Sequence, residues 1–143
     1  MKANPYLNFQ GNAEEAFLYY KSVFGGEFSS IVRFKDMPME GISIPENDQD
    51  KIMHIALPIG EDVLLMASDA LESLGQQVNQ GNNLYISLHP DTREEADRIF
   101  SALAQGADVE MQIADQPWGD YWGSLKDKFG VHWMVNHGAP QEG

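Results

Sequence analysis

The sequence predicts an α+β fold made of two consecutive units, each a strand followed by a helix and three further strands. Two observations lead to this prediction. One amphipathic helix is expected to begin after position 12 and another after position 92, and each contains the string Glu-Glu-Ala near its start. Each helix also follows one short apolar segment and precedes three others that are typical of β-strands. A pattern that recurs along a chain indicates a duplicated structural unit.

The first helix is predicted to begin after Asn12 and to end at Gly25. Asn12 and Glu15 have the spacing of a capping box, in which two side chains bind free backbone N–H groups of the first turn. Glycine is the residue that most often ends a helix. Between these ends, apolar residues recur at the spacing of one helical face, namely Ala16, Phe17, Tyr20 and Phe24.

Four strands are expected to accompany this helix, at residues 6–9, 27–34, 51–59 and 62–68. These segments are short, are rich in apolar and β-branched residues, and are bounded by turn-forming residues. A tight turn around Gly60 separates the last two segments. They are therefore expected to pair as a β-hairpin.

The second unit repeats this plan. Thr92 and Glu95 form a second capping box, and Gly106 is expected to close the helix. The apolar face of this helix consists of Ala96, Ile99, Phe100 and Leu103. Strands are expected at residues 84–89, 109–114, 121–126 and 131–137.

The two units are expected to form one domain that covers residues 1–143. The first module spans about residues 3–69, the linker about 70–82 and the second module about 83–137. A chain of this length commonly forms one compact domain, and it can bury a core without disulfide bonds or metals.

The composition is strongly acidic. Nine Lys and Arg residues stand against 22 Asp and Glu residues, which gives a formal net charge of -13. This charge repels phosphate groups, so nucleic-acid and membrane partners are not expected. The chain has no cysteine, which excludes thiolate catalysis and cysteine-ligated metals. No segment has the pattern of a signal peptide or a membrane span, and we therefore expect a cytoplasmic protein.

Five segments of the sequence carry the motifs of a known family. They are residues 5–12, 51–55, 107–111, 117–119 and 127–136, and the last of them, DKFGVHWMVN, is the most specific. With these motifs the chain resembles PhnB-type glyoxalase-like proteins of the vicinal oxygen chelate superfamily, which also contains bleomycin resistance proteins and dioxygenases. The resemblance implies the glyoxalase/bleomycin-resistance fold, in which each βαβββ module curls a mixed sheet into a half-cup.

The resemblance also indicates where a metal would be bound. Metalloenzyme members hold one divalent metal between two half-cups, with His, Gln or Glu ligands from the first and fourth strands of each module. The matching positions here fall at or beside Pro5 or Tyr6, at Met66, at Leu84 or Tyr85, and at Met134. None of them supplies a carboxylate or an imidazole, which divalent cations prefer. We therefore expect neither a metal nor another cofactor.

Polar and aromatic residues of the predicted strands are candidates to line the half-cups. His54 lies in an apolar strand, where an imidazole could act as a base or belong to the core. Strand alternation places His132, Met134 and Asn136 on one face, where they would orient a small ligand. Trp118 is predicted to lie in a loop, the kind of segment that often carries function. The predicted pocket residues are Tyr6, His54, Met66, Ser68, Tyr85, Trp118, Trp122, His132, Met134 and Asn136. No catalytic residue is assigned.

Several of these residues have a structural explanation as well. The aromatic side chains of the last third of the chain could form a core or a dimer interface as readily as a pocket. The methionines are suited to filling irregular gaps. Glu110 flanks an apolar strand, and an acid at such a position is expected to face water.

Three functions remain open at this stage. The first is a protein that binds a small, partly apolar molecule in its cup without a metal. The second is a lyase, isomerase or dioxygenase of the superfamily with an altered site that uses His54, His132 or Glu61. The third is a dimeric scaffold with a vestigial pocket. Sheet edges that need cover, together with the resemblance, predict a homodimer. Relatives also carry names linked to methyl transfer or phosphonates, but the sequence has no nucleotide-binding glycine loop.

Overall fold

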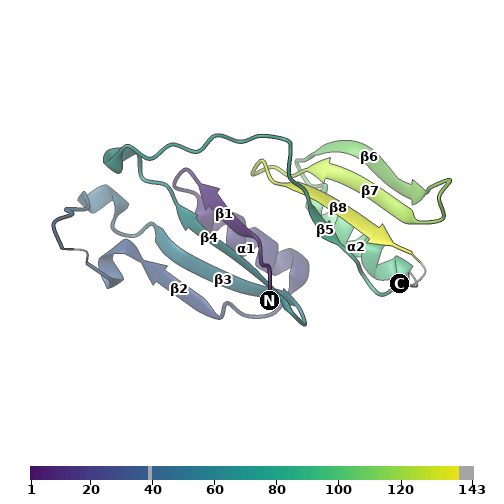
Figure 1. Ribbon diagram of the computed structural model, residues 1–143, viewed down its shortest axis with the longest axis horizontal. Coiled ribbons are helices and arrows are strands. Elements are labelled where there is room, and N and C mark those ends of the chain that lie inside the picture. Colours follow the sequence, from purple (N-terminus) through teal and green to yellow (C-terminus); the bar gives the residue numbers. More distant parts are fainter. Residues whose placement is uncertain (39, 139–143) are drawn as a thin grey trace. The chain divides into compact units, whose positions relative to one another are not determined.

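The computed structural model describes residues 1–38 and 40–138. Within these residues, two helices and eight strands follow the order β1 α1 β2 β3 β4 β5 α2 β6 β7 β8 (Figure 1). The chain divides into two compact units, residues 1–79 and 80–143. Each unit contains one helix and its own four-stranded sheet.

The first unit is a mixed sheet with one helix. Its elements are β1 (Tyr6–Phe9), α1 (Ala13–Phe24), β2 (Ser30–Arg33), β3 (Ile52–Gly60) and β4 (Val63–Asp69). The strand order is β1-β4-β3-β2. β1 runs parallel to β4, and the other neighbours are antiparallel. The first and last strands of the unit therefore lie side by side.

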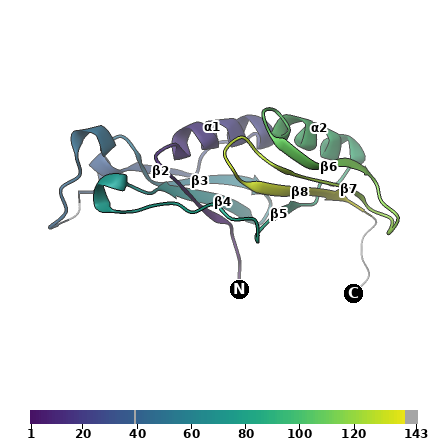
Figure 2. The ribbon, with the colours of Figure 1, turned by 90° about the horizontal axis from the view of Figure 1, so that it is seen from above.

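α1 packs on one face of the first sheet (Figure 2). Phe17 and Tyr20 of the helix are fully buried, as are Ile55, Leu65 and Ala67 of the sheet. Burying a large apolar side chain stabilises a fold by about 1.5–3 kcal/mol. The face of the sheet that α1 covers therefore forms the core of the unit. The face that points away from α1 is not part of this core.

The start of α1 differs from the prediction in its capping group. Asn12 is the N-cap residue, but its side chain makes no capping hydrogen bond. Instead, the buried carboxylate of Asp69 binds the first N–H group of the helix. It accepts hydrogen bonds from the backbone N–H of Ala13 at 2.9 Å and from that of Ile52 at 2.8 Å. Burial raises the pKa of Asp69, and the backbone hydrogen bonds oppose that rise. The last residue of β4 thus fixes both the helix start and the start of β3.

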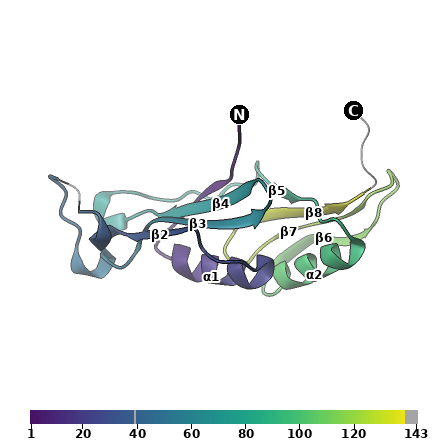
Figure 3. The same cartoon turned by 90° about the horizontal axis from the view of Figure 1, so that it is seen from below.

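The second unit repeats the architecture. Its elements are β5 (Ile86–Leu88), α2 (Arg93–Leu103), β6 (Asp108–Asp115), β7 (Tyr121–Lys126) and β8 (His132–His137). The strand order is β5-β8-β7-β6, with β5 parallel to β8 and the other pairs antiparallel. α2 lies on one face of this sheet (Figure 3).

The core of the second unit lies between α2 and its sheet. Phe100 and Leu103 of the helix pack with the buried Leu125, Trp133 and Val135 of the sheet. As predicted, the helix begins with a capping hydrogen bond, in which the side-chain oxygen of Thr92 accepts from the backbone N–H of Glu95 at 3.1 Å. This bond satisfies one of the free donors of the first turn.

Two details of the second sheet set its local shape. A Cβ atom on Gly123 would lie 2.7 Å from the Cα of Ile113 and 2.8 Å from the Cε2 of Phe100, so only glycine fits between β6 and α2. The carboxylate of Asp127 accepts hydrogen bonds from the backbone N–H of Val131 at 3.0 Å and from the Trp133 indole at 2.8 Å. These bonds stabilise the turn that leads into β8.

The structure confirms the predicted α+β fold of two βαβββ units with mixed sheets. The bounds of β1 and β7 match the prediction, whereas the second and fifth strands are shorter than the predicted ranges 27–34 and 84–89. Both are edge strands, so their ends have a partner on one side only. No helix in the described part of the chain has the length and hydropathy needed to cross a membrane.

Candidate functional site

The face of the second sheet that points away from α2 carries the polar residues of β8. Trp133 and Val135 are buried in the core. Because side chains alternate along a strand, His132, Met134 and Asn136 lie on the other face. This face is called the open face of the second sheet. It contains the three residues that the sequence places together.

Strand register extends the open face across the sheet. Lys126 of β7 lies directly opposite His132, and Asp108 of β6 lies directly opposite Lys126. Further along the same strands, Trp122 lies opposite Asn136. Directly opposed residues share a face of a sheet. The open face therefore carries charged groups at the end near His132 and an aromatic ring toward the other end.

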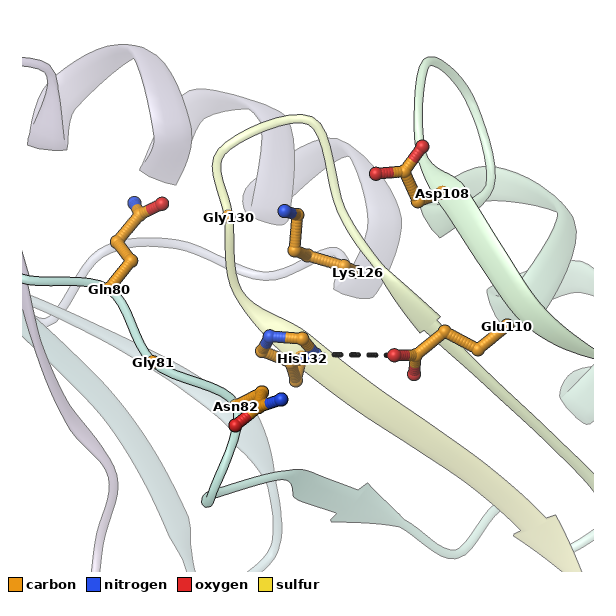
Figure 4. Close-up of a pocket in the computed structure, with 8 residues that line it drawn as sticks. All are labelled: Gln80, Gly81, Asn82, Asp108, Glu110, Lys126, Gly130 and His132. Carbon is orange, nitrogen blue, oxygen red and sulfur yellow. Dashed lines mark ion pairs between the residues drawn. The ribbon is translucent and has the colours of Figure 1, made fainter.

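A pocket of about 480 Å³ lies at the charged end of this face (Figure 4). It is lined by Gln80, Gly81, Asn82, Asp108, Glu110, Lys126, Gly130 and His132. Gln80 donates a hydrogen bond to the backbone oxygen of Phe129 at 3.0 Å. A Cβ atom on Gly130 would collide with the Gln80 side chain, and the φ of +88° at Gly130 also favours glycine. The segment before β5 is thereby held against the turn before β8.

His132 is the most buried polar side chain of this pocket, at 8% exposed. Its Nδ1 lies 3.8 Å from Oε2 of Glu110, which is too long for a hydrogen bond. This is the one fully buried side-chain nitrogen or oxygen without a hydrogen-bond partner among the residues that the structure describes. Buried polar atoms are rarely left in this state, so the atom calls for an explanation.

Tyr85 lies next to both His132 and Glu110. Its hydroxyl donates to both carboxylate oxygens of Glu110, at 2.8 and 3.0 Å. The rings of Tyr85 and His132 lie with their centroids 4.9 Å apart. The hydrogen bond to Glu110 raises the pKa of Tyr85, because ionisation would place a second negative charge beside the carboxylate. Tyr85 thus remains a hydrogen-bond donor that holds Glu110 beside His132.

The first sheet brings together the candidates of the first unit. Tyr6 lies opposite Met66 in the register, and Ser68 follows on the same face of β4. The hydroxyl of Tyr6 forms a hydrogen bond with Nδ1 of His54 at 3.2 Å. His54 is half-buried. These four residues share the face that points away from α1, where they form a smaller polar group than that of the second unit.

The two tryptophan candidates lie outside the pocket. Trp118 is 62% exposed in the loop between β6 and β7, and its ring packs edge-on against Trp122 at a centroid distance of 6.0 Å. Trp122 is half-buried on the open face. Neither they nor Met134 and Asn136 line the pocket around His132. Asn136 instead donates to Asp120 at 3.4 Å.

The residues at the family's metal positions do not suit a divalent metal. Tyr6 and Met66, and likewise Tyr85 and Met134, offer phenol and thioether groups, whereas such ions prefer imidazole and carboxylate. Within the described ranges, no group of three or more His, Asp or Glu residues could hold a metal ion. His132 and Glu110 supply only two such ligands.

Sequence reasoning missed the acidic and basic partners of His132. Glu110 is exposed to water as expected, but it also accepts a hydrogen bond from Tyr85 and lines the pocket with Asp108 and Lys126. One signal could have found them, since Asp108 and Glu110 are two positions apart on a strand and belong to one face. The approach of Glu110 to Tyr85 depends on strand order, which the local sequence does not define.

Comparisons with known proteins agree with this structure. The family model described as "3-demethylubiquinone-9 3-methyltransferase" matches residues 1–136. Protein YjdN of Escherichia coli (strain K12) is 33% identical over 144 residues, which cover 95% of each chain.

Solved structures give the same result. Protein PA1353 from Pseudomonas aeruginosa is 38% identical, with a TM-score of 0.83 over 96% of this chain and 98% of that one. A structure from Bacillus cereus, described as a putative 3-demethylubiquinone-9 3-methyltransferase, PhnB protein, is 27% identical, with a TM-score of 0.71 over 96% and 99% of the two chains. A glyoxalase/bleomycin resistance protein from Albidiferax ferrireducens shares the fold at 14% identity, with a TM-score of 0.63 over 98% and 99%.

Proposed function

The chain belongs to the 3-demethylubiquinone-9 3-methyltransferase family of PhnB-type, glyoxalase-like proteins, and from this premise we propose that it binds a small, partly apolar molecule on the open face of its second sheet, without a metal. Methyl transfer is not part of the proposal. Function depends on the residues of a site, and one fold or family name covers many activities.

The observation that carries the proposal is the pocket around His132. A pocket on which a few polar groups converge, with apolar surface beside it, is a candidate small-molecule site. The polar groups here are His132, Glu110 and Lys126. The half-buried Met134 and Trp122 continue along the same face and would contact the apolar part of the molecule.

A ligand screen by thermal unfolding tests this function. Aromatic and apolar compounds of low molecular weight should include some that raise the midpoint of unfolding, because a ligand that binds only the folded state stabilises it by about 2.7 kcal/mol at a hundred times its Kd. The stabilisation should be lost in Trp122→Ala or His132→Gln and retained in Lys128→Gln, whose side chain does not line the pocket. No stabilisation by any compound would refute the proposal.

We also propose that two copies of the chain form a homodimer. β6 is an edge strand of the second sheet, and it exposes Val109 and Met111 at 41% and 49%. An exposed edge with apolar side chains is a surface that proteins normally cover. Light scattering after size-exclusion chromatography should give twice the chain mass, and a monomer at micromolar concentration would contradict this proposal.

A further inference from the structure

We propose that the pocket around His132 selects small organic cations with N–H groups, such as ammonium or amidinium compounds, and that Nε2 of His132 accepts a hydrogen bond from them. This inference rests on the proposed function, because it names the chemical class of the molecule that the same site binds. Three steps lead to it: the protonation of the imidazole, the direction of its free nitrogen, and the charge of the lining.

The first step is the protonation of His132. Nδ1 is buried without a hydrogen-bond partner, and a carboxylate oxygen of Glu110 lies 3.8 Å from it. An ionised carboxylate only accepts hydrogen bonds, so Nδ1 can be satisfied there only by carrying the proton. A shift of about 1 Å brings the two atoms to the usual distance of such a bond. In the neutral imidazole, the lone pair then lies on Nε2.

The position of Glu110 supports this assignment. Tyr85 donates to both of its oxygens, and each oxygen keeps a lone pair for a second donor. At 3.8 Å Glu110 can reach Nδ1 after such a shift, and a carboxylate that binds one imidazole nitrogen and leaves the other free fixes the tautomer in many histidine sites. Glu110 therefore acts as the positioning residue for His132.

The second step is the direction of Nε2. In Figure 4, the second ring nitrogen of His132 lies on the side of the ring opposite Glu110, toward Asn82 and the segment that begins at Gln80. Within residues 1–38 and 40–138, it makes no hydrogen bond. A neutral imidazole thus presents an acceptor to the pocket, and it calls for a donor on the ligand.

The third step is the charge of the lining. Lys126 and Asp108 both line the pocket and carry opposite charges. Glu110 leaves one negative charge in excess. The whole chain adds to this field with a formal net charge of -13. A ligand that donates hydrogen bonds suits the acceptor on Nε2 of His132. A ligand that carries positive charge suits the negative charge of the lining.

Three benzyl compounds of similar size test the inference by isothermal titration calorimetry: benzylamine, benzyl alcohol and sodium benzoate. Benzylamine should bind about tenfold more tightly than benzyl alcohol, a factor that corresponds to about 1.4 kcal/mol, and benzoate should bind most weakly. Glu110→Gln should reduce the affinity for benzylamine to that for benzyl alcohol, and an unchanged far-UV circular dichroism spectrum shows that the variant is folded.

Matched variants separate a local effect from the overall charge. Glu94→Gln removes one acidic group from the exposed surface of α2 in the same unit, so it should retain the tenfold preference. His132→Phe retains an aromatic ring and should lose most of the affinity for benzylamine. Equal loss in Glu94→Gln and Glu110→Gln would overturn the inference.

The other outcomes are equally decisive. Equal affinity for the three compounds, tighter binding of benzoate, or binding of none of them would each overturn the preference for cations. The proposed function is tested separately, by the thermal-unfolding screen. It is supported if neutral apolar compounds stabilise the protein and this effect is lost in the Trp122 and His132 variants, and it is refuted if no compound stabilises the protein.

Discussion

Replacing Gly123 with alanine should destabilise the second unit by about 3 kcal/mol, at the upper end of the usual cost of overpacking. The added Cβ atom would lie 2.7 Å from the Cα and 2.8 Å from the backbone nitrogen of Ile113, and 2.8 Å from the Phe100 ring. Two of the three contacts are with backbone atoms, which cannot move aside as a flexible side chain can. The clash therefore forces β6 away from β7 or tilts the ring in the core.

Urea denaturation followed by tryptophan fluorescence measures this cost. With a slope of about 2 kcal/mol per molar urea, a loss of about 3 kcal/mol lowers the midpoint by roughly 1.5 M. Gly60→Ala is the matched control, since no atom lies within 4 Å of its added Cβ and its φ is outside the positive range. Its stability should be unchanged or slightly higher. A Gly123→Ala midpoint equal to that of Gly60→Ala would refute the close approach of β6.

Three further results are expected. Asp69→Ala leaves the backbone N–H groups of Ala13 and Ile52 without their acceptor, so it should lower the free energy of unfolding by about 2–4 kcal/mol in the same urea assay; an unchanged midpoint would contradict this role. The hydrogen bonds from Arg33 lower the pKa of Glu14 below 4.5, so this pair stabilises the fold above that pH and loses its effect as the pH falls through the lowered value. NMR titration should show the pKa of Glu14 rising in Arg33→Gln, and the stability difference between the two proteins should narrow in acid. Protein purified without a chelator or histidine tag should contain no stoichiometric metal by mass spectrometry, and divalent zinc, manganese or nickel should not raise the midpoint of thermal unfolding; one bound metal per chain would require ligands beyond the pair His132 and Glu110.

Local signals in the sequence were sufficient to predict the duplicated fold. Hydrophobic periodicity gave both helices, and the capping bond of Thr92 is present as predicted. Gly25 ends α1 as predicted, whereas α2 has its C-cap at Ala104, before the predicted Gly106. Asn12 is the N-cap residue as predicted, but the hydrogen bond predicted for its side chain is absent, and the backbone N–H of Ala13 in the first turn is bound by Asp69. Asp69 lies 56 positions further along the chain than Ala13, and only strand order brings the two together. Propensity rules describe neighbours in sequence, so they cannot detect a capping group, such as Asp69, that lies far away along the chain.

The candidate site was predictable only along single strands. Alternation correctly placed His132, Met134 and Asn136 on one face of β8. The contacts between strands were not accessible, since Glu110 reaches Tyr85 from an edge strand 25 positions away. An acid on an edge strand usually faces water, and the sequence alone does not distinguish that case from a carboxylate held beside an imidazole.

The pairing of the first strand with the last one in each unit has a consequence for the order of folding. Tyr6 of β1 finds its partner at Met66 of β4, and Ile86 of β5 finds its partner at Trp133 of β8. Neither sheet can be completed on the ribosome until nearly the whole unit has emerged, whereas the hairpin of β3 and β4 and the antiparallel pair of β7 and β8 need only local chain. Contacts between such distant positions slow folding. In each unit, the first strand can therefore pair only after the last strand has been synthesised and has joined the sheet.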